Sequence, residues 1–536
     1  MCSSPKGIWR LVNYFRNKNV ANDMWDKFSE DTPDIVNILT KHFSSSFNHN
    51  IVNSLNDIVF DVRNCTVNFV ELNEVYSMLN NLCINKAHGH DGFSNRILRI
   101  FSPFIAEPLC SLINCCLRTC NFPQVWKYAT VCPIPKCSSP SLLEFRPISL
   151  LPTMSKICEK IVLNFYRDVL ISFYSEHQHA YRPATSSVTA IAQFHDTVTK
   201  FLDTSCKGVR VICFDLAKAF DSVRHDLLVQ KIADNIGLPF ANFVKNYLVD
   251  RSGKVFVKGI SGDTFSFSSG VPQGSVLGPY LFNFFMGNLI YEFSRTFNND
   301  NYLIIMYADD ILVIEKVISF ESHVSSVNFI LNRFKHHDLK CNIIKCSQSF
   351  YAKGNLSSNI HPFANNYDNL PFVIEFKYLG VIFSSLSNFD TYIDYLVSRV
   401  SKRIYVIRSL KHSGVCAKEL LIVYNSLILN VVLYALPLFW SFSKQNITEL
   451  VKIHKRCHTI ICGVGCDCAA LPDIAYSRSV KLFNNCNRIT HPLYYCIPEV
   501  LPSGRFRQPV VSTSRRFHSF FPYFANIFNN NFCRPR

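Results

Sequence analysis

The sequence of this 536-residue chain predicts an α+β fold in which an antiparallel sheet is combined with helices. LIIMYADDILVIEK (303–316) consists of two apolar runs around a tight turn, which is typical of a β-hairpin. VRVICFD (209–215) is an apolar run that predicts a buried strand with an acid at its carboxyl end. Residues 393–410 carry apolar side chains at steps of three or four, the period of a helix.

The other elements follow from local patterns in the first half of the chain. TPDIVNILTKHFSSSF (32–47) predicts a helix, and residues 86–101 predict a glycine-containing loop that leads into an amphipathic helix. Residues 126–163 predict a strand, a turn, a second strand and a helix. Residues 208–232 begin as a strand and are expected to become helical near Lys218.

The second half is predicted in the same way. Residues 268–290 predict a Gly/Pro turn followed by an almost entirely apolar helix, and FKYLGVIF (376–383) predicts one further strand. Beyond it, the helix over 393–410 has a basic second face. The last stretch, residues 504–536, is basic and aromatic, and we expect it to be poorly ordered.

Charge and hydropathy limit the class of partner. The net charge is +16, which favours a polyanion, either nucleic acid or an anionic membrane surface. The longest apolar run, residues 427–440, is too short to span a membrane and contains Asn430 and Pro437, so we expect it in the core and expect no membrane partner. Residues 1–18 have no apolar region typical of a secretory signal, so we expect an intracellular protein, in nucleus or cytoplasm.

The 22 cysteines contain no Cys-x-x-Cys pair, and we expect most of them to be reduced and buried. The densest group is Cys457, His458, Cys462, Cys466 and Cys468, to which His491 and Cys496 are possible additions. Its spacing matches no standard zinc pattern well, so the sequence leaves a zinc site there open.

Three carboxylates carry the strongest chemical signal. Asp309 and Asp310 lie in the hairpin turn, where aspartate is common for conformational reasons alone. Asp215 ends the neighbouring apolar strand, and if the hairpin lies beside that strand the three acids converge. Clustered carboxylates repel one another unless cations neutralise them, and Mg²⁺ is the usual ion beside phosphates. The cluster therefore predicts two Mg²⁺ ions, with Mn²⁺ as a possible substitute, that activate a 3′-hydroxyl and stabilise a leaving pyrophosphate.

The order of the motifs resembles the reverse transcriptases of non-LTR (LINE-type) retrotransposons. From residue 86 to 383 the chain carries, in order, KAHGHDG, PIPK, FRPISLL, QHAYRP, FDLAKAFDSV, GVPQGSVLGP, YADD, CNIIKC and FKYLGV. The resemblance implies a right-hand polymerase with fingers, palm and a helical thumb, which copies an RNA template into cDNA from a DNA primer or target with dNTPs.

The resemblance also implies roles for individual residues. Asp215 and Asp309 would bind both metals, and Asp310 would complete the cluster. Phe220 matches a steric gate against a 2′-hydroxyl, and Lys345 matches a lysine near the pyrophosphate that is a candidate proton donor. Gln273 and Gly274 match the loop that lies against the nascent base pair. Lys136 and Arg146 match fingers positions that contact the triphosphate. Arg182 matches a fingers arginine near the template or nucleotide.

The resemblance divides the chain into five expected parts. These are an N-terminal region (1–85), a fingers extension (86–117), the reverse transcriptase domain (118–384), a helical thumb-like region (385–465) and a basic tail (466–536). Ala180 and His88 depart from the usual glycine and proline, outside the metal site. The 85 residues before KAHGHDG are too few for the endonuclease that normally precedes this domain. We therefore expect a chain that extends a supplied 3′-end without nicking DNA, as the C-terminal portion of a longer protein or a degraded copy.

Three alternatives remain at this stage. An RNA-dependent RNA polymerase would share the palm, but it typically has an acid where this chain has Phe220. A catalytically inactive or domesticated RNA-binding remnant would be expected to lose the acids that only catalysis needs, and all three are present. A zinc-dependent DNA-binding protein would need a cleaner Cys/His array.

Overall fold

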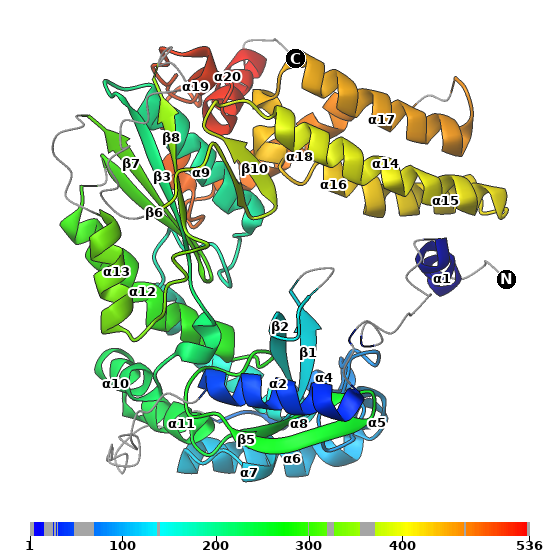
Figure 1. The fold of residues 1–536 in the computed structure, drawn as a ribbon, viewed down its shortest axis with the longest axis vertical. Coiled ribbons are helices and arrows are strands. Elements are labelled where there is room, and N and C mark those ends of the chain that lie inside the picture. The colour runs from blue at the N-terminus through cyan, green and yellow to red at the C-terminus, as the bar shows by residue number, and fades with distance from the viewer. Residues whose placement is uncertain are drawn as a thin grey trace.

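The computed structural model describes residues 5–15, 25, 28, 31–47, 69–136, 140–298, 300–318, 326–353, 370–465 and 468–532. Its ribbon has the outline of an open letter C (Figure 1). A sheet with surrounding helices forms the lower part, a second sheet the upper left, and a group of helices the upper right. This arrangement confirms the predicted α+β class and corresponds to fingers, palm and thumb.

The palm sheet has the strand order β6-β7-β3-β8, and each neighbouring pair is antiparallel. Its strands are β3 (Gly208–Asp215), β6 (Tyr302–Tyr307), β7 (Asp310–Val317) and β8 (Ser347–Ala352), which confirms the predicted strand and hairpin. Side chains alternate between the two faces of a strand. On β3, Ile212 and Phe214 therefore join one hydrophobic core, whereas Val209 and Val211 join the other. Both faces of the sheet are buried.

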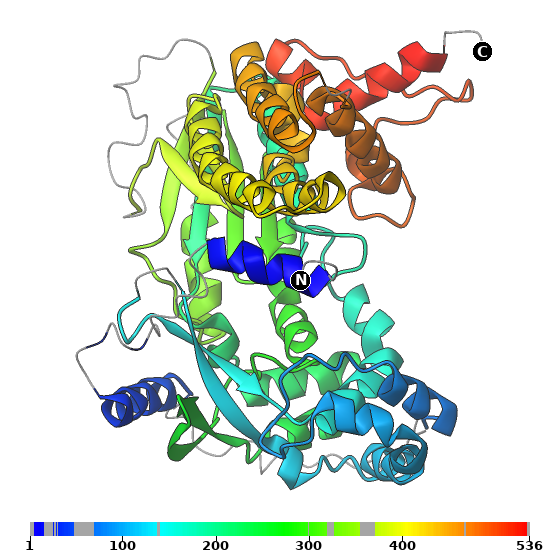
Figure 2. The ribbon, with the colours of Figure 1, turned by 90° about the vertical axis from the view of Figure 1, so that its right-hand side faces the viewer.

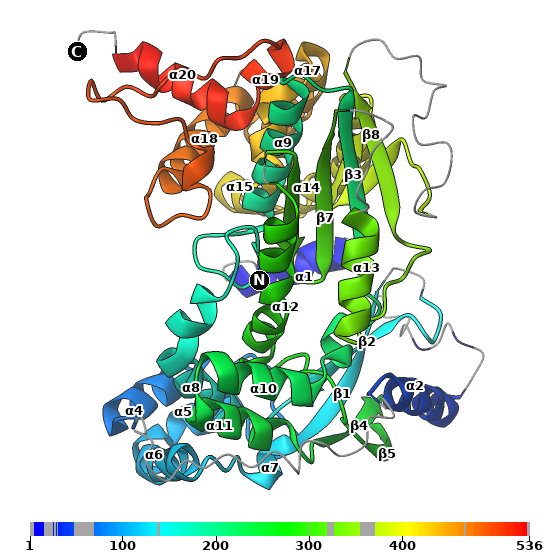
Figure 3. The same cartoon turned by 90° about the vertical axis from the view of Figure 1, so that its left-hand side faces the viewer.

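Helices cover the two faces of this sheet. On one side lie α12 (Gly278–Thr296) and α13 (Ser326–His336), which Figure 3 shows in front of and below the strands. On the other lies α9 (Ser187–Leu202), and the short helical turn η2 (Ala219–Ser222) follows β3. The segment predicted to become helical near Lys218 thus forms only the single turn η2. The regular helix α10 (His225–Asn235) begins seven residues after Lys218.

The fingers contain the sheet β2-β1-β4-β5, in which β1 (Tyr128–Pro135) and β4 (Ser252–Val257) are parallel. The other two strands are β2 (Phe145–Leu150) and β5 (Ile260–Ser266). The predicted helix α2 (Thr32–Phe47) packs on this sheet through Ile35, Leu39 and Phe43. The remaining helices are α4 (Leu72–Asn80), α5 (Asn95–Ile100), α6 (Ser102–Thr119), α7 (Gln124–Lys127), α8 (Thr153–Ser172) and α11 (Leu238–Leu248).

The thumb-like region is helical, as predicted. Its long helix α14 (Asp390–His412) buries the predicted stripe from Ile393 to Leu410 and exposes Arg399 and Lys402. It packs against α15 (Ala417–Tyr424) and α17 (Lys444–Cys462). Between them run η3 (Asn425–Leu429), α16 (Asn430–Val432) and η4 (Leu436–Ser441), so the apolar run 427–440 lies in the core as expected. Figure 2 shows α1 (Pro5–Phe15) between these helices and the fingers, and Ile8 and Val12 join the same core.

One predicted strand was wrong. FKYLGVIF forms two short antiparallel strands, β9 (Glu375–Tyr378) and β10 (Val381–Ser384), in a separate sheet. The chain reverses at Leu379 and Gly380, whose φ angles are +46° and +84°. Two consecutive residues with positive φ form the tight turn that matches the twist of a hairpin, and glycine adopts this conformation without strain.

The expected poor order of the last stretch was also wrong for residues 504–532. These residues contain α19 (Ser514–Phe517) and α20 (Phe520–Phe532), which pack with α18 (Leu471–Cys486) and with η5 (Tyr494–Cys496) nearby. Phe520, Phe521 and Phe524 are fully buried, and Arg516 forms a buried 2.5 Å ion pair with Asp196 of α9. The aromatic residues therefore supply a small core, and the buried arginine has a carboxylate partner.

Among the described residues, none of the helices combines the length and the hydropathy that crossing a bilayer requires. The five expected domain boundaries remain predictions.

Candidate active site

The register of the palm sheet brings the first two acids together. Strand β3 pairs with β7 from Gly208↔Val317 through to Asp215↔Asp310, so these two aspartates are directly opposite each other at the end of the ladder. Side chains of directly opposed residues in an antiparallel pair lie on the same face. The last pair of the ladder thus places two carboxylates side by side, as the sequence predicts.

A two-residue turn places the third acid. Tyr307 pairs with Asp310, so Ala308 and Asp309 form the turn of the hairpin, and Ala308 has a φ of +56°. The buried amide of Gln178 holds this turn, because its Oε1 accepts hydrogen bonds from the backbone N–H groups of Ala308 (3.1 Å) and Ala180 (3.0 Å). Gln178 was missed at the sequence level, where its only signal is its place in QHAYRP.

The electrostatics of the acids match the expected repulsion. Burial, together with the charge of Asp215, raises the pKa of Asp309. Burial and the charges of Asp309 and Asp215 raise the pKa of Asp310 to about 6, although this residue is open to solvent on one side. The positive charge of Arg146 opposes both shifts. Among the described residues, the oxygens of the three carboxylates are not all within 4.8 Å of one another. Repulsion between like charges accounts for this separation.

This donor set fits hard divalent cations. Carboxylate oxygens are the ligands that Mg²⁺ prefers, Mn²⁺ takes the same ligands, and a cation would relieve the repulsion that raises the two pKa values. The three acids are the residues that would hold such ions.

We expect the acid cluster to make metal-free protein less stable as pH rises. A raised pKa means that the fold favours protonated Asp310, so stability is lost as pH rises from the ordinary carboxyl value of 3.8 to about 6. In EDTA, Asp310→Asn should therefore melt at a higher temperature than wild type at pH 7.5, and this difference should be clearly smaller at pH 5. Thermal melts at both pH values test this. Equal differences at the two pH values would contradict it.

Phe220 lies beside the acid cluster. It follows β3 in η2, is half-buried, and stacks on the buried ring of Phe282 with 4.3 Å between ring centroids and an interplanar angle of 17°. The ring of Tyr181 meets it edge-on at 6.5 Å, and the pKa of Tyr181 is raised by burial and by the charge of Asp309. An aromatic pair thus connects Phe220 to the turn acid. Tyr181 is a second residue that sequence reasoning missed.

The loop with Gln273 and Gly274 lies against the fingers. The backbone carbonyl of Gln273 accepts a 2.7 Å hydrogen bond from the N–H of Ser149 in β2. Gly274 has a φ of +113°, and a Cβ there would lie 2.5 Å from the carbonyl oxygen of Ser149. The side chain of Gln273 donates a hydrogen bond to the carboxylate of Asp221. This acid is buried, and burial raises its pKa to about 6. Only glycine permits this close contact, so the loop is fixed between η2 and β2.

Three predicted cations approach the site from two directions. Lys136 directly follows β1 and Arg146 lies on β2, and both are exposed. Lys345 is exposed in the segment after Asn342, whose N–H donates to the carbonyl of Asp215 (2.8 Å). The pKa of Glu144 is lowered by hydrogen bonds from Ser141 and further by the charges of Lys345 and Lys136. The lysines of palm and fingers therefore share one electrostatic environment.

Arg182 is used differently from the other cations in this structure. Its Nη1 donates to the carbonyls of Ser175 (2.6 Å) and Tyr174 (3.4 Å), and burial lowers its pKa. The side chain thus holds the segment before Gln178. Its expected role near template or nucleotide stays a prediction.

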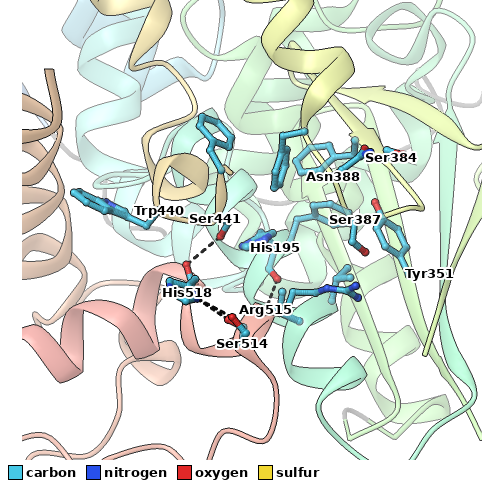
Figure 4. A pocket seen from close by; sticks show the side chains of 16 residues that line it. His195, Tyr351, Ser384, Ser387, Asn388, Trp440, Ser441, Ser514, Arg515 and His518 are labelled. Carbon is cyan, nitrogen blue, oxygen red and sulfur yellow. Dashed lines mark hydrogen bonds between the residues drawn. The ribbon is translucent and has the colours of Figure 1, made fainter. Parts of the chain in front are cut away.

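A cavity of about 330 Å³ lies elsewhere, between α9, β8, β10 and the C-terminal helices (Figure 4). His195, Tyr351, Trp440 and Arg515 are among its lining residues, and the side chain of Ser514 bonds to His518. No residue of the predicted site lines it. The candidate active site is the acid cluster, not this cavity.

Comparisons with known proteins find similarity to reverse transcriptases. Residues 134–383 match the family described as "Reverse transcriptase (RNA-dependent DNA polymerase)". The chain is 25% identical to the probable RNA-directed DNA polymerase from transposon BS of Drosophila melanogaster, over 72% of this chain and 44% of that protein. It is 26% identical to the RNA-directed DNA polymerase from mobile element jockey of the same species, over 71% of this chain and 42% of that protein.

A solved structure also matches part of the chain. It is apo telomerase from Candida tropicalis, truncated from the C-terminal domain, with 14% identity and a TM-score of 0.35 over 49% of this chain and 54% of that one. The chain spans less than half the length of the BS and jockey proteins.

Proposed function

Residues 134–383 of this chain form a reverse transcriptase domain of the non-LTR retrotransposon class, and from that premise we propose that the protein copies an RNA template into DNA from a 3′-hydroxyl primer. The observation that carries the proposal is the pairing of Asp215 with Asp310 beside the turn acid Asp309. The experiment that tests it is primer extension with dNTPs on an RNA template.

The three acids would hold two Mg²⁺ ions at this end of the sheet. When bound, such ions lower the pKa of an attacking 3′-hydroxyl and neutralise charge on the transferring phosphate. The protein's contribution is rigid placement. Asp215 ends a strand that is buried on both faces, and Gln178 fixes the turn that carries Asp309. Side chains on such a support need little reorganisation during the reaction.

The incoming nucleotide would lie between the acids and the fingers. Lys136 and Arg146 supply positive charge for its triphosphate, and the effect of Arg146 on the pKa values of Asp309 and Asp310 supports this position. Phe220 would lie under its sugar, and the loop of Gln273 and Gly274 would lie against its base. Lys345 would stand near the departing pyrophosphate as a proton donor, since its ammonium carries the proton that such a role needs.

Nucleic acid would follow the basic surface. The chain has a net charge of +16, and Arg399 and Lys402 are exposed on α14. Cations that neutralise phosphates make binding strongly dependent on salt. We propose that the thumb-like helix follows the template–primer backbone, without reading its sequence.

Arg146→Lys is expected to raise the KM for dNTP several-fold with little change in template affinity. Arginine can donate two parallel hydrogen bonds to a phosphate, whereas lysine is a point charge with a different reach. Steady-state primer extension over a range of dNTP concentrations measures this KM. Arg99→Lys, which changes an exposed arginine of α5, is the matched control and should behave as wild type. Unchanged dNTP kinetics in Arg146→Lys would remove this contact from the proposal.

A further inference from the structure

A second cluster of possible metal ligands lies in the thumb-like region, away from the acids. His454, His458 and Cys468 each offer one ligand atom, and these atoms lie within 4.8 Å of one another. The two histidines are one turn apart on α17, and Cys468 comes from the segment that leads into α18. The sequence pattern singled out this neighbourhood but missed His454 and included Cys457.

We propose that His454, His458 and Cys468 bind a zinc ion. Imidazole nitrogen and cysteine sulfur together are a typical ligand set for zinc. In tetrahedral zinc sites, bond lengths of about 2.0–2.3 Å place neighbouring ligand atoms roughly 3.3–3.8 Å apart. The Nε2 of His454 and the Sγ of Cys468 are already 3.9 Å apart. A shift of about 1 Å in side-chain positions therefore closes the set.

His454 is oriented as metal-binding histidines usually are. Its Nδ1 lies 2.6 Å from the hydroxyl of Tyr424, and its ring is buried. A partner on one ring nitrogen sets which nitrogen is left for the metal. The other nitrogen, Nε2, faces Cys468 and lies 3.0 Å from the carbonyl of Ala469. A zinc ion bound at Nε2 would replace the contact with the carbonyl of Ala469. The Nδ1–H group of His454 would then donate its hydrogen bond to the hydroxyl of Tyr424.

Cys462 completes the set as the fourth ligand. It lies one turn after His458 on the same face of α17, and it lines one cavity with His458 and Cys468. The walls of this cavity include Leu421, Leu429 and Ile474, so the polar ligand atoms converge in an apolar surrounding. Cys462 is exposed at the end of the helix, where its side chain can rotate toward the site.

Cys457 does not belong to this site. It is fully buried in the hydrophobic core, and its sulfur is not among the ligand atoms that cluster with those of His454 and His458. The site would therefore tie the end of α17 to the start of α18, and so join the thumb-like region to the C-terminal helices. This role requires no polymerisation, so it stands or falls separately from the proposed function.

The test is the metal content of the full chain. Protein purified with zinc and then freed of excess metal should retain about one zinc per chain by elemental mass spectrometry. With Co²⁺ in place of zinc, it should show the near-ultraviolet absorption of thiolate bound to Co²⁺ and the strong visible bands of a tetrahedral site. His458→Asn and Cys468→Ser should lose the bound metal, and Cys462→Ser should lose about half of the thiolate absorption.

Two variants serve as matched controls. His412→Asn and Cys416→Ser change an exposed histidine and an exposed cysteine of the same region, and both should keep one zinc. Wild-type protein with less than about a tenth of a zinc per chain and no thiolate band would overturn the proposal, and this result needs no variant to fold. Unchanged zinc content in Cys468→Ser would overturn it as well.

Discussion

Replacing Asp215 or Asp309 by asparagine is expected to abolish nucleotide addition while the chain stays folded. Asparagine has the shape of aspartate but lacks the charge that holds a cation. Since charge neutralisation by metal is central to phosphoryl transfer, we expect a loss of about 4 kcal/mol or more in transition-state stabilisation, which is roughly a thousandfold in rate. Folding should be unchanged or improved, because burial and repulsion already disfavour the charged form of Asp309.

Single-turnover primer extension measures this effect on chemistry apart from product release. Asp234→Asn, which changes an exposed acid on α10, is the control and should retain wild-type rates. Circular dichroism and the melting temperature show that each variant is folded. Activity like that of wild type in either Asp215→Asn or Asp309→Asn would refute the assignment of the acids.

Phe220→Ala is expected to relax the choice of sugar by about a hundredfold. An aromatic ring under the ribose can accept no hydrogen bond from a 2′-hydroxyl, and burying that hydroxyl without a partner costs roughly 1–3 kcal/mol. Overlap with a packed ring costs about as much again. The stacking on Phe282 supports this role, because it holds the ring in one position. In the variant, ribonucleotide use should rise relative to dNTP use.

Loss of packing needs its own control, because the variant also removes the contact with Phe282. Phe329→Ala removes a half-buried ring from α13 in the same hydrophobic core, away from η2. It should lower stability without changing sugar choice. The measured quantity is the ratio of kcat/KM for dNTP to that for rNTP. An unchanged ratio in Phe220→Ala would mean that the ring is only part of the core.

Much of the fold is predictable from local patterns. Strand β3, the hairpin and helix α14 were predicted from alternation, turn residues and the helical period, and the structure confirms them. The convergence of Asp215 with Asp310 was predicted only conditionally, because strand pairing is a long-range property. The metal-binding role of the three acids was inferred from their expected clustering, whereas the roles of the other seven predicted site residues came from the resemblance. All of these roles remain predictions.

Other features depend on contacts that no local pattern reveals. FKYLGVIF has the composition of one strand, and only the turn at Leu379 and Gly380 divides it. The C-terminal stretch resembles a basic tail, but Phe520 and its neighbours find a core and Arg516 finds Asp196. Gln178 is unremarkable in sequence because its partners are backbone groups of the hairpin turn. His454 lies outside the cysteine-rich stretch and reaches it through one turn of helix.

The most direct test of the central claim is primer extension by the purified full chain on an RNA template of mixed sequence. With Mg²⁺, all four dNTPs and an annealed DNA primer, the protein should make DNA that is complementary to the template, and omission of one dNTP should stop synthesis at the first matching template base. The acid cluster accounts for this activity only if EDTA abolishes it and added Mg²⁺ restores it. A folded wild-type chain that binds the RNA–primer duplex but adds no nucleotide with Mg²⁺ or Mn²⁺ would contradict the account and identify an RNA-binding remnant.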